Sequence, residues 1–520
     1  MKKKLAIVLT AVMVISTLAG CSQETPEQDN VDGNGNSVVQ ENEIPEILEF
    51  GMTGEETKPL EGMTNIYLSD DGMEVDGSAI STDKNQAVYA ANDIVFYLAD
   101  QGFTYGEGEE ADEHTQEEAD AHTVVHITEP GSYAVRGQLS AGQIAIDLGE
   151  DAKEDPEAVV TLYLNGVDIN CDVAPAIIFY NVYECGSTEE EAAAKDVDTS
   201  AAGANVVIVD GTANKVSGSY VARIYKSYTL NEAGTEVVDN KKLHKYDAAF
   251  YSKMSMNIDG GEKNTGTLNI YAENEGLDSE LHLTMNGGNI YIESGNDGIN
   301  TNEDGISVTT INDGTLNIVV NGSTGEGDGI DSNGWLVING GNICAIACGF
   351  SEDAGIDSDM GIYLNGGNVV ASGNMLDQIA GNEQPYVVFM SRSSLSGSNT
   401  YTVKDADSNI VSGINTPNDF RYLLVSNAEM EDEKAYTLWS GDTQVAEGMV
   451  GMNGMGGPGM GGFGGPGMGK FGGRGQDGFG GKNGEVPALP EGMNPGEMPA
   501  PPEGMNPGEI PEGVQPPEIR

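Results

Sequence analysis

The stretch Met285-Asn286-Gly287-Gly288-Asn289-Ile290-Tyr291-Ile292 joins a turn to an alternating run, and this frame returns at regular intervals. Asn312, Asn339 and Asn365 follow Asn286 at spacings of 26, 27 and 26 residues. Each alternating run predicts a strand with one buried face. A unit of about three short strands cannot bury its apolar face alone, whereas stacked units can. The sequence therefore predicts an all-β solenoid, a parallel β-helix.

A second frame runs in step with the first. Glu275-Gly276-Leu277-Asp278 becomes Asp297-Gly298-Ile299-Asn300, then Asp328-Gly329-Ile330-Asp331 and Ala354-Gly355-Ile356-Asp357. In stacked coils, equivalent residues lie about 4.8 Å apart. We therefore expect three buried apolar columns and one amide ladder: Leu268, Ile290, Leu316, Ile343 and Val369; Ile270, Ile292, Ile318, Ala345 and Ala371; Leu277, Ile299, Ile330 and Ile356; and Asn286, Asn312, Asn339 and Asn365.

The same stacking crowds carboxylates. Asp331 and Asp357 occupy equivalent places in adjacent coils, where two charges at an effective dielectric near 20 repel by roughly 3 kcal/mol. No Lys or Arg occurs between Asn264 and Ser391, so we expect no counter-charge from the protein. A solvated acidic edge is one interpretation. We favour Ca²⁺, which takes six to eight oxygen ligands, at these candidate residues: Glu275, Asp278, Asp297, Asn300, Asp328, Asp331, Asp353 and Asp357.

The composition limits the classes of partner. The 520 residues include 83 Asp+Glu and 24 Lys+Arg, for a formal net charge of −59. Such a chain does not bind nucleic acid non-specifically, because that requires Lys and Arg to neutralise phosphates. It also does not dock on anionic lipid through basic patches. Such a chain must either spread its negative charge over a large surface or bind cations.

The chain divides into four segments by composition. Residues 1–20 combine three lysines with a short apolar run and predict a signal peptide. It ends in Leu18-Ala19-Gly20-Cys21, which resembles a bacterial lipobox, so we expect lipidation at Cys21. Residues 21–58 predict an acidic flexible tether, and residues 59–446 the β-helix with a closing strand pair. Residues 447–520 are a Gly/Met/Pro-rich tail, which we expect to be disordered.

The other four cysteines give no metal motif. Cys344 and Cys348 are four residues apart on one predicted strand, about 13 Å, which is too far for a disulfide. A bridge between Cys171 and Cys185 stays open. The chain has no Cys-x-x-Cys, so zinc is not expected.

The repeated x-Gly-Ile-Asp-Ser and Asn-Gly-Gly frames, with Ile127-Thr128-Glu129-Pro130-Gly131 upstream, resemble the carbohydrate-binding β-helix domain of bacterial cell-surface lipoproteins. The resemblance covers roughly residues 60–446. It implies a right-handed parallel β-helix like that of pectate lyases, bound Ca²⁺, and binding of acidic polysaccharide such as polygalacturonate without demonstrated cleavage. Members of this family often carry Lys after Gly-Ile, where Asn300, Asp331 and Asp357 stand here.

Three functions compete. The first is a calcium-dependent, carbohydrate-binding surface lipoprotein, monomeric and attached to the membrane only by its lipid. Outward-facing Tyr291, Trp335 and Tyr363 would stack on sugar rings. The second is a polysaccharide lyase, which needs a base and a cation; the lack of Lys and Arg in the regular coils counts against it, and Lys226, Lys245 and Lys253 just upstream keep it open. The third is a structural spacer or adhesin without glycan affinity.

Overall fold

The computed structural model describes residues 49–52, 54, 57–431 and 434–450. The predicted signal peptide, the lipidation at Cys21, most of the tether and the tail from residue 451 lie outside these residues. The described part is all-β, with one short α-helix, α1 (Gln116–Asp120), and 3-10 turns η1 (Glu110–Asp112), η2 (Glu150–Glu154) and η3 (Glu190–Ala192). None of its helices has the length and apolarity needed to cross a membrane.

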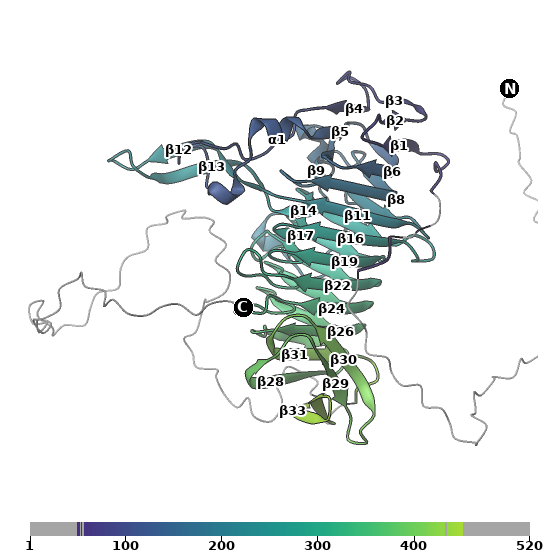
Figure 1. Ribbon diagram of the computed structural model, residues 1–520, viewed down its shortest axis with the longest axis vertical. Helices are drawn as coiled ribbons and strands as arrows, with labels where there is room; N and C mark the ends of the chain where they lie inside the picture. The colour runs from purple at the N-terminus through teal and green to yellow at the C-terminus, as the bar shows by residue number, and fades with distance from the viewer. Residues whose placement is uncertain (1–48, 53, 55–56, 432–433, 451–520) are drawn as a thin grey trace, which may run out of the picture. The chain divides into compact units, whose positions relative to one another are not determined.

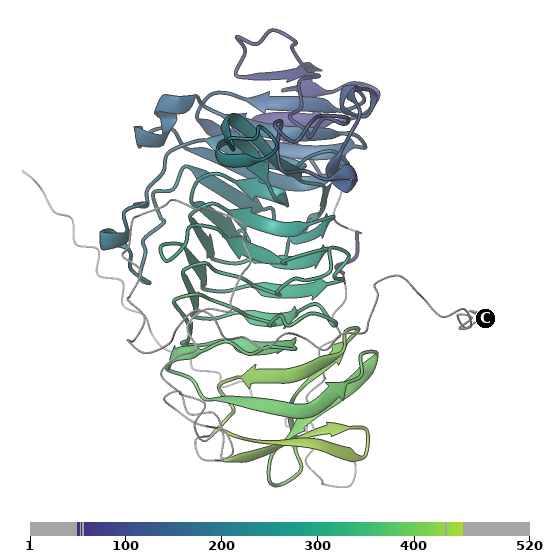
Figure 2. The same ribbon diagram turned by 90° about the vertical axis from the view of Figure 1, so that its left-hand side faces the viewer.

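Most strands fall into three rows in which strands from successive repeats pair in parallel (Figures 1 and 2). Row one consists of β1 (Thr64–Leu68), β6 (Gly131–Leu139), β8 (Val160–Cys171), β11 (Ala213–Gly218), β16 (Thr267–Ala272), β19 (Asn289–Ser294), β22 (Thr315–Val320), β24 (Asn342–Ile346) and β26 (Asn368–Gly373).

Row two consists of β5 (Thr123–Ile127), β7 (Gly142–Asp147), β9 (Ile177–Asn181), β14 (Ala248–Ser252), β17 (Glu275–Ser279) and β20 (Ile299–Thr301). Row three, which also pairs with the start of β8, consists of β10 (Ala204–Ile208), β15 (Met256–Asp259), β18 (His282–Met285), β21 (Val308–Ile311), β23 (Trp335–Ile338), β25 (Gly361–Leu364) and β27 (Ile379–Asn382). The chain visits rows one, two and three in turn, for example through β16, β17 and β18, before it returns to row one at β19.

The predicted columns are confirmed. Leu268 pairs with Ile290, Ile290 with Leu316, and this column continues through Ile343 to Val369. The column that begins at Leu277 continues to Ile299, Ile330 and Ile356. All of these side chains are at most 2% exposed. The amide ladder also forms, since the Nδ2 of Asn312, Asn339 and Asn365 donates to the preceding Oδ1 at 2.9, 2.9 and 2.8 Å.

Glycine is required where rows one and two meet inside the stack. A Cβ on Gly298 would lie 2.2 Å from Ile318 Cγ2 and 2.6 Å from the Gly329 carbonyl oxygen. We therefore expect Gly298→Ala to lower the free energy of unfolding by roughly 1–3 kcal/mol, the usual cost of overpacking. Gly102→Ala is the control, because its Cβ would meet nothing within 4 Å. Chemical unfolding of both variants measures the difference, and equal stability of the two would contradict this packing account.

Antiparallel strands close both ends of the parallel rows. At the N-terminal end β4 (Val88–Ala91) pairs with β5, and β2 (Glu74–Val75) and β3 (Ser78–Ala79) extend from β1. At the other end β31 (Phe420–Ser426) pairs with β26 and β28 (Tyr386–Leu395). A separate sheet holds β29 (Asn399–Lys404), β30 (Ile410–Thr416), β32 (Ala435–Ser440) and β33 (Thr443–Met449). The closing region thus begins at Tyr386, well before the closing strand pair that the sequence predicts at Tyr422–Ala446.

Two segments between strands of the rows extend outward from the stack. The hairpin β12 (Val221–Leu230) and β13 (Val237–Tyr246) projects from the stack between β11 and β14 (Figure 1). Residues 182–203, between β9 and β10, contain the acidic run Glu189-Glu190-Glu191; we call residues 182–203 the strap. The last residues of the predicted tether also contact the rows, since the Asn269 amide bonds the backbone of Phe50 and the Asn165 amide bonds that of Lys58.

Candidate functional site

The outward face of row two gathers carboxylates from successive coils. Asp278 pairs with Asn300, and Asp331 and Asp357 follow because their backbone N–H groups donate to the carbonyls of Ile299 and Ile330 at 2.8 and 2.7 Å. We call this face the acidic corner. Its members are Asp247, Glu275, Asp278, Asp297, Asn300, Asp328, Asp331 and Asp357.

The upper part of the acidic corner is a buried group of three carboxylates. One oxygen each from Asp247, Glu275 and Asp278 lie within 4.8 Å of one another, and the residues are 7%, 6% and 0% exposed. Glu275 Oε2 and the Asn300 Oδ1 are buried and accept no hydrogen bond from any described residue. Buried oxygens without donors are costly unless something pairs with them, so this arrangement fits a cation.

The lower part is a more open group. Oxygens of Asp328, Asp331 and Asp357 also lie within 4.8 Å of one another, and these residues are half-buried. Asp377 Oδ2 is buried and receives no hydrogen bond within the described residues. The acidic corner therefore offers two places where three carboxylates converge, separated by the coil that carries Asp297 and Asn300.

Crowding and burial shift the acid–base behaviour of these groups. Burial, followed by the charge of Asp247, raises the pKa of Glu275 to about 8. Burial, followed by neighbouring carboxylates, raises the pKa of Asp331 and of Asp357 to about 7. Burial with adjacent acids also holds the pKa values of Asp278, Asp297 and Asp328 well above the usual range. Because burial disfavours the charged form, these carboxylates need a positive partner to ionise at neutral pH.

The expectation that the protein supplies no counter-charge is wrong. Lys245, at the end of β13, places its Nζ 2.7 Å from Asp247 Oδ2. Burial alone would lower the pKa of Lys245, but the charges of Asp247 and Glu275 raise it above its usual value. The hairpin, which has no counterpart in the other repeats, thus brings one ammonium to the upper group.

Three predicted carboxylate ligands are partly engaged by backbone N–H groups, and one of them is Asp328, whose Oδ1 accepts the Ala354 N–H at 2.5 Å. Asp353 Oδ2 accepts the Gly327 N–H at 2.7 Å and the Ser351 hydroxyl. Asp297 Oδ1 accepts the Asp328 N–H at 2.7 Å. These bonds tie one coil to the next, which leaves Asp353 the weakest candidate ligand of the predicted set.

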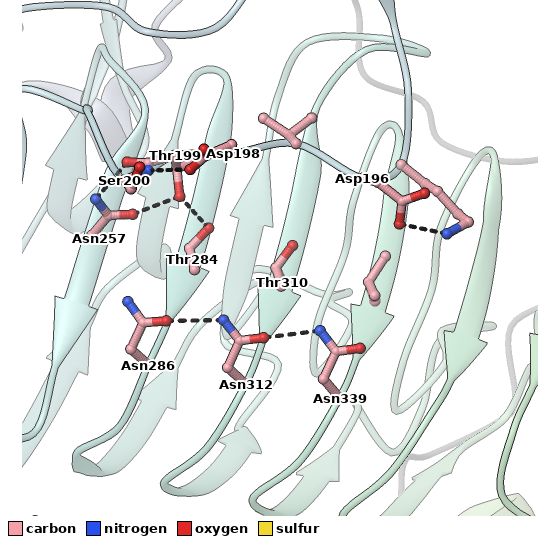
Figure 3. A pocket seen from close by; sticks show the side chains of 13 residues that line it. Asp196, Asp198, Thr199, Ser200, Asn257, Thr284, Asn286, Thr310, Asn312 and Asn339 are labelled. Atoms are coloured by element: carbon pink, nitrogen blue, oxygen red, sulfur yellow. Dashed lines mark hydrogen bonds and ion pairs between the residues drawn. The ribbon is translucent and has the colours of Figure 1, made fainter.

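A groove lies on the adjoining face, between the strap and the outward side of row three (Figure 3). Its volume is about 410 Å³. The strap is fastened at one end, where the Thr199 hydroxyl bonds Asn257 Oδ1 and Thr284 Oγ1, both at 2.7 Å. Beyond this anchor the groove is lined by Asp196, Asp198, Thr310, Val337 and three amides of the ladder (Asn286, Asn312 and Asn339). Hydroxyl, amide and carboxylate groups around a small apolar floor suit the mixed polarity of a sugar.

The three predicted aromatic residues do not share one surface. Tyr291 lies on β19 in row one, where it is 8% exposed and its ring is 6.1 Å from that of Tyr271. Trp335 and Tyr363 are half-buried on β23 and β25 in row three. Lys195 of the strap sits 5.1 Å above the Tyr363 ring. Only the row-three pair lies near the groove.

Sequence reasoning missed Asp247 and the strap side of the groove, and it named Lys245 only as a candidate base for a lyase, not as a counter-charge to the acidic corner. Asp247 precedes Ala248, which pairs with Glu275, but its coil reads Ala248-Ala249-Phe250-Tyr251 in place of the repeated Gly-Leu-Asp. The frame that located the other acids is therefore absent there. A signal was present in part, because Lys245 and Asp247 directly precede the strand of the first recognisable coil.

Comparison with known proteins adds a family. No curated protein matches the chain. A solved structure, described as the polysaccharide lyase-like protein from C. thermocellum in its gadolinium derivative, is 18% identical, with a TM-score of 0.31; the match covers 58% of this chain and 90% of that chain. The family model for carbohydrate-binding domain-containing proteins matches residues 121–421, more than half of the chain and most of the three rows. The chain belongs to this family of carbohydrate-binding domain-containing proteins.

Proposed function

We propose that this protein is a calcium-dependent carbohydrate-binding lipoprotein of the cell surface, which binds acidic polysaccharide and does not cleave it. The family supports carbohydrate as the partner. The observation that carries the calcium dependence is the upper group of the acidic corner, with the unpartnered oxygens of Glu275 and Asn300. Calcium would bridge these oxygens to carboxylates of the glycan, which an acidic surface otherwise repels.

The donor set fits a hard divalent cation. Asp247, Glu275, Asp278 and Asn300 offer only oxygen ligands at the upper group, and Asp328, Asp331 and Asp357 do so at the lower group. When bound, Ca²⁺ supplies positive charge and open coordination positions for ligand oxygens. The protein residues hold the ion, and the Asn302 amide, which donates to both oxygens of Asp278 at 2.9 Å, fixes the orientation of one carboxylate.

We also propose that the three rows wind as a right-handed parallel β-helix. The parallel registers from β8 to β26 and the near-universal right-hand rule for parallel crossovers support this. In this arrangement the acidic corner and the groove lie on adjoining faces, on rows that follow each other in the chain. An extended glycan running along the stack would meet the coils at intervals of about 4.8 Å.

The proposed location and assembly rest on the sequence. The lipobox ending in Cys21 supports a lipid anchor on the outer face of the cell membrane, and the acidic residues after it support a tether. We propose a monomer, because the high negative charge opposes self-association. The Gly/Met/Pro-rich segment from residue 447 would then extend beyond the binding domain.

A polysaccharide lyase is the second candidate, because a lysine does lie beside the acidic corner. β-Elimination needs a base that is unprotonated near neutral pH. Lys245 does not meet this requirement, since Asp247 and Glu275 raise its pKa. Its ion pair with Asp247 at 2.7 Å holds the ammonium form. Lys245 therefore does not support cleavage, whereas Lys253, whose pKa burial lowers, keeps the lyase as the second candidate.

A glycan array probed with and without chelator tests the proposal. We expect binding to polygalacturonate in calcium and loss of at least about 90% of that signal in chelator, the size of a tenfold or greater loss of affinity. Neutral glycans on the same array are the control. Equal binding in both buffers would contradict calcium dependence, and no binding to any glycan would favour the spacer. A rising ultraviolet absorbance during incubation with polygalacturonate, from an unsaturated product, would favour the lyase.

A further inference from the structure

Three lysines lie near the N-terminal end of the acidic corner. Lys253 occupies the turn after β14, Lys242 lies on β13 of the hairpin, and Lys153 lies on η2. The carbonyl of Lys153 accepts the Glu184 N–H at 3.1 Å, and the Glu184 carboxylate accepts the N–H of Ser255, two residues after Lys253, at 2.7 Å. The backbone N–H of Lys253 donates to Phe179 O, and that of Glu280, one coil on, donates to Ser252 O, both at 2.9 Å. Lys253 and Glu280 are therefore equivalent turn residues in adjacent coils, directly after the strands that carry the corner.

Lys253 is half-buried, and no described residue pairs with its side chain. Within the described residues its Nζ has no hydrogen bond and no ion pair. Burial first, and then the positive charges of Lys153 and Lys242, lower its pKa, while Glu280 and Asp147 partly oppose this. Glu280 is occupied otherwise, since its carboxylate accepts the Tyr251 hydroxyl and lies 3.9 Å from Lys242 Nζ. A half-buried ammonium without an anion, in a chain of net charge −59, is an unfilled site for an anionic group.

We propose that Lys153, Lys242 and Lys253 form an anion-binding subsite that takes a carboxylate group of the glycan beside the cation-binding corner. This inference rests on the proposed binding of an acidic glycan. A polyuronate lying along the stack would place one carboxylate against these lysines and the next ones against calcium in the acidic corner. The two contacts differ in chemistry, because the lysines act as fixed charges and the corner acts through a bound ion. Because the lysines lie at one end of the corner, the subsite fixes the orientation in which the glycan binds along the stack.

Lys253→Gln in the full-length protein tests the subsite, with Lys263→Gln as the matched control. Lys263 is an exposed lysine on the turn after row three, so both variants lose one positive charge. We expect Lys253→Gln to weaken polygalacturonate binding about tenfold in calcium, as for a lost charge-assisted hydrogen bond. Lys263→Gln should bind like the wild type. Equal affinities of the two variants, or an equal loss in both, overturn the subsite. A wild type whose binding survives chelation contradicts only the calcium proposal.

A second measurement detects anion binding at Lys253 without any polymer. Lysines carrying ¹³C-methyl groups keep their charge, and the Lys253 signal is assigned by its absence in Lys253→Gln. We expect this signal, and not that of Lys263, to shift on addition of galacturonate, and the Lys253 pKa to rise because a bound carboxylate favours the ammonium. An equal shift with inorganic sulfate indicates a general anion site, whereas a shift confined to galacturonate indicates recognition of the sugar acid. No shift with either anion overturns the proposal.

Discussion

Metal-free protein is expected to lose stability as the pH rises from about 4.5 to about 8, and calcium is expected to remove this loss. Burial, followed by Asp247, raises the pKa of Glu275 from 4.5 to about 8 in the folded protein. Between these values the folded state keeps a proton that the unfolded chain has released, so the free energy of unfolding falls with rising pH. The stabilisation is complete below 4.5 and is lost by about 8. At 1.36 kcal/mol per pKa unit, Glu275 alone contributes on the order of 5 kcal/mol.

Bound calcium is expected to remove this pH dependence of the free energy of unfolding, because an ion in the acidic corner favours the charged carboxylates. At a hundredfold excess over its dissociation constant, a ligand of the folded state adds about 2.7 kcal/mol. We therefore expect the melting temperatures with and without calcium to converge near pH 5 and to separate by several degrees at pH 8. Thermal unfolding of metal-stripped protein, followed across this range in both conditions, measures the effect. Magnesium at the same concentration is the control for ionic strength. Two parallel pH profiles would contradict the cation site and favour a solvated acidic edge.

The periodic part of the fold was predictable from the sequence because identical constraints recur in every coil. Leu277, Ile299, Ile330 and Ile356 each fill the same inward position, so a spacing argument suffices to stack them. The same reasoning brought Asp278, Asn300, Asp331 and Asp357 onto one face. It works because a parallel register preserves the direction of every side chain from coil to coil.

Features supplied by the insertions were not predictable in this way. Lys245 reaches the acidic corner because the hairpin returns the chain there, and no repeat carries an equivalent residue. The strap covers row three through the particular bonds of Thr199 to Asn257 and Thr284, which no periodicity encodes. Tyr291 was placed on an outward face, but its neighbour Tyr271 and its own fit against row one leave it buried. Long-range docking of non-repeated segments depends on contacts that have no sequence spacing to reveal them.

Replacing the upper acids with their amides is expected to stabilise the metal-free protein while it removes the response to calcium. In Glu275→Gln/Asp278→Asn the shape of both side chains is kept, and two buried carboxylates that repel each other and Asp247 are lost. At pH 8 we expect the metal-free melting temperature to rise by several degrees, since a few kcal/mol of charge burial disappears. The calcium-dependent rise should shrink to the share supplied by the lower group.

The matched controls carry the same chemical changes at exposed acids. Glu262 and Asp313 lie on the turns after row three, away from the acidic corner. The variants Glu262→Gln and Asp313→Asn should leave both melting temperatures within about 1 degree of the wild type.

The variant Asp331→Asn/Asp357→Asn tests the lower group separately from the upper group. The effects of the two double variants on calcium binding should be additive, because the two groups lie in different coils and use separate ligands. We expect calorimetry to show loss of one calcium-binding event in each double variant and of both in the quadruple variant. Wild-type calcium binding in Glu275→Gln/Asp278→Asn would remove the upper group from the site. A metal-free protein that is destabilised by these amides would mean that the carboxylates are held charged by Lys245 alone, and that the ion pair with Asp247 already satisfies the corner.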